Sequence, residues 1–130
     1  MNEHRGWIGH WQTQNFDSDE FRCSCCGIED MNVDFISKLQ RARDIAGVPF
    51  IINSGYRCAK HNAEVGGTLG SSHLIGRAAD ISVYGAMKRF TILSALLEAG
   101  LTRIGIRQDF IHVDIDERKT EKAVWLYDPN

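Results

Sequence analysis

Two stretches of the chain repeat apolar residues at the spacing of an α-helix, which places them on one face. The first covers residues 34–46, with its apolar positions at Phe35, Leu39, Ala42 and Ala46. Gly47 and Pro49 follow it, and both residue types end helices. The second covers residues 87–99, with expected inward positions at Phe90, Leu93, Leu96 and Leu97. We therefore predict two long helices that each bury one face.

Shorter apolar segments between and after these helices predict strands. The strands are expected at residues 50–52, 79–83, 102–106, 110–115 and 123–127. Residues 17–21 and 58–64 have the composition of short helical turns, and residues 68–77 that of a loop rich in Gly and Ser. Helices and antiparallel strands in this order predict an α+β fold, with helices packed on a small antiparallel sheet.

Alternation along two of these strands gathers polar residues on one face of the sheet. In residues 110–115, His112 and Asp114 point to the same side, while the apolar residues between them face the core. Asp80 lies on the corresponding polar side of residues 79–83. Asp109 lies an odd number of residues before His112, so we expect it in the preceding turn, reaching back over the same site.

These polar residues match the needs of a catalytic zinc ion. Such sites use three protein ligands, often histidines with a carboxylate, and keep one position open. His73, Asp80 and His112 would supply the ligands. Asp109 is then a spare carboxylate of the kind that accepts a proton from attacking water. Taken singly, each residue is more simply an ordinary histidine, a solvated aspartate or a turn aspartate, but their combination favours a metal site.

The segments around these residues closely resemble the zinc D-alanyl-D-alanine carboxypeptidase family. Its signature, Ser-x-His-x-x-Gly-x-Ala-x-Asp, matches residues 71–80 at every fixed position, and its His-x-Asp strand matches residues 112–114. Residues 21–23, 54–57 and 62–67 also resemble this family, so the resemblance runs from about residue 16 to the C-terminus. It implies the hedgehog-like fold of the zinc D,D-peptidases. It also implies one catalytic zinc ion, held by His73, Asp80 and His112.

The resemblance implies roles for the residues beside the metal as well. Arg57 would bind a carboxylate or carbonyl oxygen of the substrate with its rigid donor fork, although a surface charge is the simpler alternative. Ser71 would donate to substrate or stabilise its own loop. Asp114 would support a ligand histidine without being a ligand itself. Asp109 would be the general base, because the family's base precedes the last zinc histidine by three residues.

Composition narrows the classes of partner. The chain of 130 residues has room for one domain, which we assign to residues 16–130, with residues 1–15 as an N-terminal extension packed on or flanking it. A net charge of -2 without a basic stripe argues against nucleic acid. No apolar run approaches the ~18 residues needed for membrane insertion. We expect the protein to act as a monomer.

The four cysteines, Cys23, Cys25, Cys26 and Cys58, leave alternatives open. The N-terminus lacks the apolar segment of a secretory signal peptide, so we expect synthesis in the cytoplasm and free thiols. Buried thiols that pack as small apolar groups are the favoured interpretation. A second, structural zinc site is the alternative, although adjacent cysteines are an unusual ligand pair. His4, His10 and His61 are not expected to be ligands.

Together these expectations describe a zinc-dependent peptidase that hydrolyses peptidoglycan stem peptides. Without a signal peptide it would reach the cell wall by holin-type release or virion delivery. That route favours an endolysin-like L-Ala-D-Glu endopeptidase of phage or prophage origin, by analogy. D-Ala-D-Ala carboxypeptidase activity is the alternative within the family. A non-catalytic zinc-containing binding module, or a virion structural protein, is the alternative outside enzymes, and the intact Asp109 and Arg57 argue against it.

Overall fold

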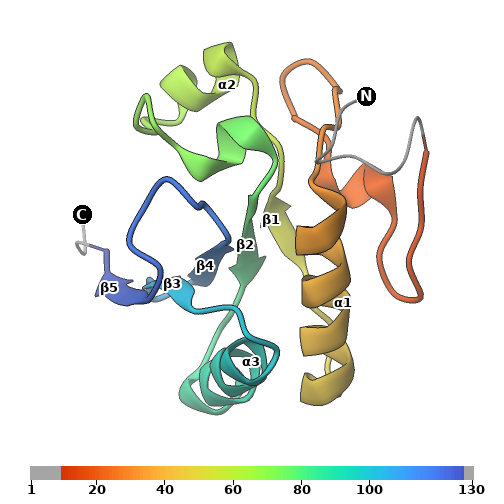
Figure 1. Ribbon diagram of the computed structural model, residues 1–130, viewed down its shortest axis with the longest axis vertical. Helices are drawn as coiled ribbons and strands as arrows, with labels where there is room; N and C mark the ends of the chain where they lie inside the picture. The colour runs from red at the N-terminus through yellow and green to blue at the C-terminus, as the bar shows by residue number, and fades with distance from the viewer. Residues whose placement is uncertain (1–9, 128–130) are drawn as a thin grey trace.

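A five-stranded sheet with helices on one face makes up the body of the protein (Figure 1). The computed structural model describes residues 10–127. The α-helices α1, α2 and α3 cover Val33–Ala46, Ala59–Glu64 and Ala86–Glu98, and the 3-10 helices η1 and η2 cover Ser18–Phe21 and Ser72–Ile75. The strands β1 to β5 cover Ile52–Ser54, Ala78–Ser82, Arg103–Ile106, Phe110–Asp114 and Ala123–Leu126.

The sheet has the strand order β1-β2-β4-β3-β5. Neighbouring strands are antiparallel except at one edge, where β5 runs parallel to β3. The predicted α+β fold is confirmed, while the all-antiparallel sheet is wrong at this edge. The loop of residues 115–122 returns the chain past β3, so that β5 runs in the same direction as β3.

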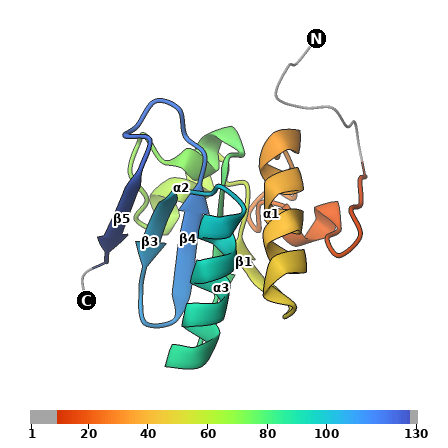
Figure 2. The same cartoon turned by 60° about the horizontal axis from the view of Figure 1, so that its bottom comes forward.

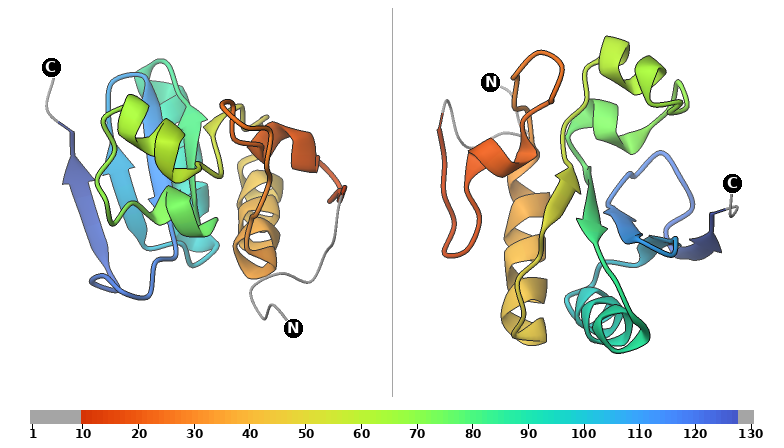
Figure 3. Two further views of the ribbon diagram at one scale, coloured as in Figure 1. Left: turned by 90° about the horizontal axis from the view of Figure 1, so that it is seen from above. Right: turned by 180° about the vertical axis from the view of Figure 1, so that it is seen from behind.

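The two faces of the sheet have opposite character. Helices α1 and α3 lie side by side over one face and bury its apolar residues (Figure 2). That core includes Phe35, Leu39, Ile81, Ile92, Leu96, Ile104, Ile111 and Val113. On the other face the alternating positions are polar, as predicted for Asp80, His112 and Asp114. Helices α2 and η2 lie at the end of the sheet away from α3 (Figure 3). They leave a polar cleft over this second face.

Two sequence expectations about apolar segments are wrong in detail. In α3, Phe90 and Leu97 are 72% and 43% exposed, and the buried residues are Ile92, Ala95 and Leu96. Both sets have helical spacing, so periodicity alone could not choose the buried face. The first strand begins at Ile52 instead of Phe50, although Phe50 is buried in the core against Phe16, with a ring-centroid distance of 6.5 Å.

The described part of the expected N-terminal extension packs on the domain. Trp11 is buried and lies 5.6 Å from the Phe21 ring, measured between centroids. The helical turn predicted at residues 17–21 is η1, and Asp17 and Glu20 form a capping box at its start. Trp7 and His4 lie outside the described residues. Within residues 10–127, no helix is long and apolar enough to cross a membrane.

Candidate metal centre

One row of residues runs across four strands on the polar face of the sheet. Asp80 on β2 is opposite His112 on β4, His112 is opposite Gly105 on β3, and Gly105 is opposite Trp125 on β5. A Cβ atom on Gly105 would lie 2.6 Å from Nε1 of Trp125. Because Gly105 has no side chain, the indole can cover its backbone and approach His112, with ring centroids 5.6 Å apart.

The third residue of the site, His73, comes from the η2 turn instead of the sheet. Ser71 caps this turn, with its Oγ 3.2 Å from the His73 backbone N–H. Gly76 ends it in the left-handed conformation, with φ of 68°, and a Cβ atom there would collide with the carbonyl oxygen of Asp30. The predicted loop of residues 68–77 therefore contains a fixed helical turn, which turns the imidazole of His73 inward.

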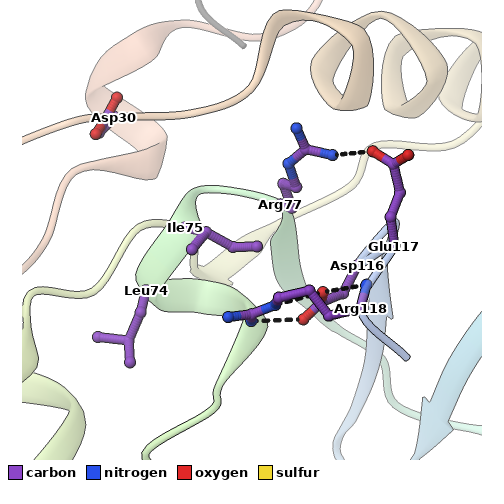
Figure 4. Close-up of a pocket in the computed structure, with 7 residues that line it drawn as sticks. All are labelled: Asp30, Leu74, Ile75, Arg77, Asp116, Glu117 and Arg118. Atoms are coloured by element: carbon purple, nitrogen blue, oxygen red, sulfur yellow. Dashed lines mark hydrogen bonds and ion pairs between the residues drawn. The ribbon is translucent and has the colours of Figure 1, made fainter.

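A buried aspartate behind η2 anchors this turn. Asp116 is fully buried and accepts a hydrogen bond from Ser72 Oγ at 2.7 Å. Arg118 donates to the same carboxylate from Nε at 2.9 Å and from Nη2 at 2.8 Å, as Figure 4 shows beside Ile75. These hydrogen bonds, with that of Arg118 first, hold the pKa of Asp116 well below its usual range despite its burial. The pocket drawn in Figure 4 has a volume of about 430 Å³ and lies outside the polar cleft.

Hydrogen bonds determine which nitrogen of His73 is free to bind a metal. Its Nδ1 lies 2.7 Å from the carbonyl oxygen of Gly55. A carbonyl oxygen can only accept, so Nδ1 carries the proton and the Nε2 of the neutral ring has a lone pair. This Nε2 is buried, makes no hydrogen bond within the described residues and lies 3.3 Å from Asp80 Oδ1. Such a tautomer is the one that a metal-binding histidine requires.

The same logic applies to His112 with its two nitrogens exchanged. Asp114 Oδ2 lies 2.8 Å from Nε2 of His112, and Asp80 Oδ1 lies 2.9 Å from Nδ1. Asp114 is itself held by Arg103, whose Nε donates at 2.7 Å. If Asp114 accepts the Nε2 proton, Nδ1 is the lone-pair nitrogen and faces Asp80. The carboxylate of Asp114 therefore has the geometry to hold the His112 ring in place.

Charge is concentrated at this point. Burial raises the pKa of Asp80, but the hydrogen bond with His112 and the close approach of His73 outweigh it and hold this pKa well below its usual range. Burial lowers the pKa of His112, but contacts with Asp114 and Asp80 outweigh it and raise this pKa. With both carboxylates ionised, the site attracts positive charge. A proton on His112, or a cation bound between the imidazole rings of His73 and His112, can provide this positive charge.

The residues present fit a zinc ion. One ligand atom each of His73, Asp80 and His112 lies within 4.8 Å of the others, and all three residues are buried. With the tautomers described above, all three atoms are acceptors, which would repel one another without a cation between them. Two imidazole nitrogens and one carboxylate oxygen are a common ligand set of catalytic zinc, with a fourth position open.

This group lies in a cleft of about 460 Å³ between the sheet and the α2–η2 region. The cleft is lined by Arg57, Val65, Gly66, Gly67, Thr68, Ser71, Ser72, His73, Asp80, Arg103, Arg107, Phe110, His112, Asp114, Lys119, Trp125 and Tyr127.

A comparison with family models matches residues 14–114 to the model described as Peptidase M15. The chain belongs to the Peptidase M15 family. A comparison with curated proteins finds no match. Members of this family are zinc-dependent metallopeptidases, in agreement with the resemblance found in the sequence.

Most of the residues that the sequence assigns to an M15 site line this cleft, but Asp109 does not. It lies in the β3–β4 turn, with a side chain 49% exposed and 3.4 Å from Nε of Arg107. Its carboxylate lines a neighbouring pocket with Tyr84, Arg89 and Tyr127. Arg107 and Tyr127 line both spaces, so Asp109 is at the rim of the cleft.

Three cations of the M15 cleft are missing from the sequence-based assignment, namely Arg103, Arg107 and Lys119. Arg103 holds Asp114 and lies over the Trp125 ring, 5.1 Å from its centroid. Lys119 lies 3.2 Å from Ser72 Oγ. Alternation could have identified Arg103, because it precedes the core residue Ile104 in a strand and so points to the polar face. Lys119 lies in a loop, where no periodicity gives its direction.

The four cysteines gather away from the M15 cleft, and all are free thiols. Cys23 is buried and Cys58 is half-buried, whereas Cys25 and Cys26 are exposed. The expectation of buried thiols is therefore wrong for two of the four. Burial raises the pKa of the Cys23 thiol, but backbone N–H groups of Cys58, Cys26 and Cys25 outweigh it and lower this pKa to about 6.

Proposed function

We propose that this M15 domain is a zinc peptidase that hydrolyses peptidoglycan stem peptides. The observation that carries the proposal is the buried set of acceptor atoms from His73, Asp80 and His112 at the floor of an open cleft. When bound there, zinc supplies Lewis acidity, which polarises a peptide carbonyl and lowers the pKa of water towards ~7. The remaining work falls to the side chains around it.

Arg57 is positioned to bind the substrate. Its Nε, Nη1 and Nη2 donate to Ser54, Asn62 and Asp80 at 3.1, 3.1 and 3.2 Å. A guanidinium has five N–H groups, so two remain for a substrate carbonyl or carboxylate. The three internal hydrogen bonds fix the plane of the group beside Asp80. Arg57 therefore presents donors to the cleft without a further loss of side-chain freedom.

Asp109 is our proposed general base. It would accept a proton from the attacking water and return it to the leaving amine. From its position at the rim it must move inward with the β3–β4 turn when substrate binds. One carboxylate atom, Oδ1, is buried and makes no hydrogen bond within the described residues, so the ion pair with Arg107 is the main restraint on the side chain. Breaking that exposed ion pair costs at most about 1 kcal/mol. The backbone of the turn is held separately, by Val83 N–H at the Asp109 carbonyl and by Arg89 at the Gln108 carbonyl, and these two hydrogen bonds would have to lengthen as well.

The charge of the cleft supports an acidic peptide as substrate. Arg57, Arg107 and Lys119 line it, and the stem peptides of peptidoglycan carry free carboxylates. We assign an endolysin-like L-Ala-D-Glu endopeptidase of phage or prophage origin. D-Ala-D-Ala carboxypeptidase activity is the second candidate, because the same cations would bind a C-terminal carboxylate.

Digestion of purified peptidoglycan tests this proposal. The wild-type chain should release peptides, a chelator should stop the release, and added zinc should restore it. Mass analysis of the products separates the two activities, since the endopeptidase exposes a new D-Glu amine and the carboxypeptidase releases D-Ala. A His73→Ala variant serves as the inactive control. A zinc-loaded, folded wild type that releases nothing would show a non-catalytic zinc-binding module instead.

A further inference from the structure

We propose that a second zinc ion binds outside the cleft, held by Cys23, Cys26 and Cys58. Cys23 and Cys26 lie in the loop of residues 22–28, and Cys58 lies at the N-terminus of α2. All three are distant in sequence from β4, the strand that carries His112. The proposal is independent of the peptidase assignment, because it involves none of the cleft residues.

The spacing of the three sulfur atoms fits a shared ion. Each Sγ lies within 4.8 Å of the other two, and those of Cys23 and Cys58 are 3.6 Å apart. Two thiolates that bind one tetrahedral zinc at about 2.3 Å have sulfur atoms about 3.8 Å apart. Three thiols from two separate parts of the chain thus converge at the distance that one zinc ion requires.

The backbone of the loop has the form that zinc-binding turns use. Cys23 and Cys26 are separated by two residues, the common ligand spacing, so the adjacent pair Cys25–Cys26 does not have to share the ion. Gly27 turns the chain with φ of 75°, and Cys23 N–H donates to the Ile28 carbonyl at 2.8 Å. This closed turn points both thiols to the same side.

Backbone donors surround the sulfur atoms. The Cys58 N–H lies 3.4 Å from Cys23 Sγ, and the His61 N–H lies 3.4 Å from Cys58 Sγ, where it caps α2. The Ile28 N–H also faces Cys26. Such donors disperse negative charge on sulfur, so they stabilise the thiolate form that binds metal.

Two side chains adjoin the three thiols and are the candidates for the fourth ligand. Cys25 has its thiol against that of Cys58. His61 has Nε2 3.0 Å from Oγ of Ser24, in the middle of the cysteine loop. With His61 the set is Cys-x-x-Cys and Cys-x-x-His, and with Cys25 it is four thiolates, and both sets occur in structural zinc sites.

A disulfide between Cys23 and Cys58 is the competing outcome. It would require the sulfurs to approach to about 2.05 Å and two electrons to pass to an external oxidant. It would also leave Cys26 and its backbone donor without a function. Zinc binding uses all three thiols and needs no oxidant.

Metal analysis of the full chain purified under reducing conditions tests the proposal. The wild type should contain two zinc ions, and Cys23→Ser, Cys26→Ser and Cys58→Ser should each contain one. His73→Ala should also contain one, which distinguishes failure of this site from failure of the cleft. Between Cys25→Ser and His61→Ala, the variant that loses an ion identifies the fourth ligand. Ser24→Ala, in the same loop, is the matched control and should retain both.

A spectroscopic measurement on the wild type covers the case in which a cysteine variant does not fold. Cobalt bound in place of zinc should give the intense thiolate-to-metal charge-transfer absorption, which the nitrogen and oxygen ligands of the cleft cannot produce. One zinc per wild-type chain, with no such absorption, would overturn the proposal. So would a thiol titration that finds Cys23 and Cys58 oxidised in the protein purified under reducing conditions.

Discussion

The cleft has a strand-borne half and a loop-borne half, and the two are held in different ways. Asp80 and His112 face each other across β2 and β4, so the sheet ladder fixes the separation of their backbones, and side-chain hydrogen bonds only orient the two groups. His73 and Arg57 lie on irregular segments, and separate contacts fix each of them: Gly55, Asp30 and Asp116 around η2, and Ser54, Asn62 and Asp80 around the guanidinium. The comparison teaches that a loop residue needs several long-range contacts to reach the precision of a strand residue.

Removing one ligand from each half gives the largest expected effect. We expect His112→Ala and His73→Ala each to lose the cleft zinc and all peptidoglycan hydrolysis, since two ligands bind zinc far more weakly than three. Metal content and product release measure this. His10→Ala, at an exposed histidine outside the cleft, is the control. Full zinc retention in either variant would exclude the substituted histidine as a zinc ligand.

Asp109 in the turn and Asp114 on the strand flank His112, and substitutions of the two compare the role of a turn residue with that of a strand residue. Asp109→Asn, in the turn, should keep the fold and the zinc while hydrolysis falls by ~10²–10⁴-fold, because asparagine cannot accept the proton. Asp114→Asn, on the strand, should weaken zinc affinity by ~10–100-fold, because it supports the ligand ring. Zinc titration and turnover of both variants separate the roles. Near-normal turnover of Asp109→Asn would leave it as a turn residue and refute its role as base.

Arg57 tests how much geometry matters in the loop-borne half. Arg57→Lys keeps the charge but loses the planar donors, and we expect a loss of ~1.5–3 kcal/mol in transition-state binding, roughly ten-fold or more in rate. Kinetic constants on a defined stem peptide measure it. Arg41→Lys, on the exposed side of α1, should leave the rate unchanged. Equal rates for the two variants would exclude Arg57 from substrate binding.

Removing the charge of the anchor of the η2 turn should give a free-energy change of similar size, but in stability. Asp116→Asn should lower the free energy of unfolding by ~1.5–3 kcal/mol at pH 7, because it weakens charge-assisted hydrogen bonds. Folding depresses the pKa of this carboxyl, so its stabilisation is complete above the unfolded value of ~3.9 and is lost as the pH falls. Denaturant unfolding at pH 7 and below pH 3.9 should show the difference between wild type and variant shrinking in acid.

A matched change beside Asp116 controls for charge alone. Glu117 has a side chain 84% exposed, and Glu117→Gln should change stability little at either pH. A constant Asp116→Asn penalty across this range would contradict the ionised anchor.

The accuracy of the sequence-based predictions also differs between the strand-borne half and the loop-borne half. Strand alternation put Asp80, His112 and Asp114 on one face, because a two-residue period depends only on local backbone geometry. The η2 turn was expected to be loop, since its contacts come from Asp30 and Asp116, distant in the chain. Residue spacing allowed Cys23 and Cys26 as a ligand pair, but it could not show that Cys58 joins them, because this depends on how the loop folds onto α2.

The bare backbone at Gly105 has a consequence for redesign of the cleft. A methyl group there would meet the indole of Trp125 and the ring of Tyr127, at 2.6 and 2.7 Å, and both rings line the cleft wall. The position of both rings therefore depends on a residue that contributes no side chain to the cleft. An engineer who wishes to change which peptides the cleft admits would keep Gly105 bare and alter Trp125 or Tyr127, which leaves the reactive residues untouched.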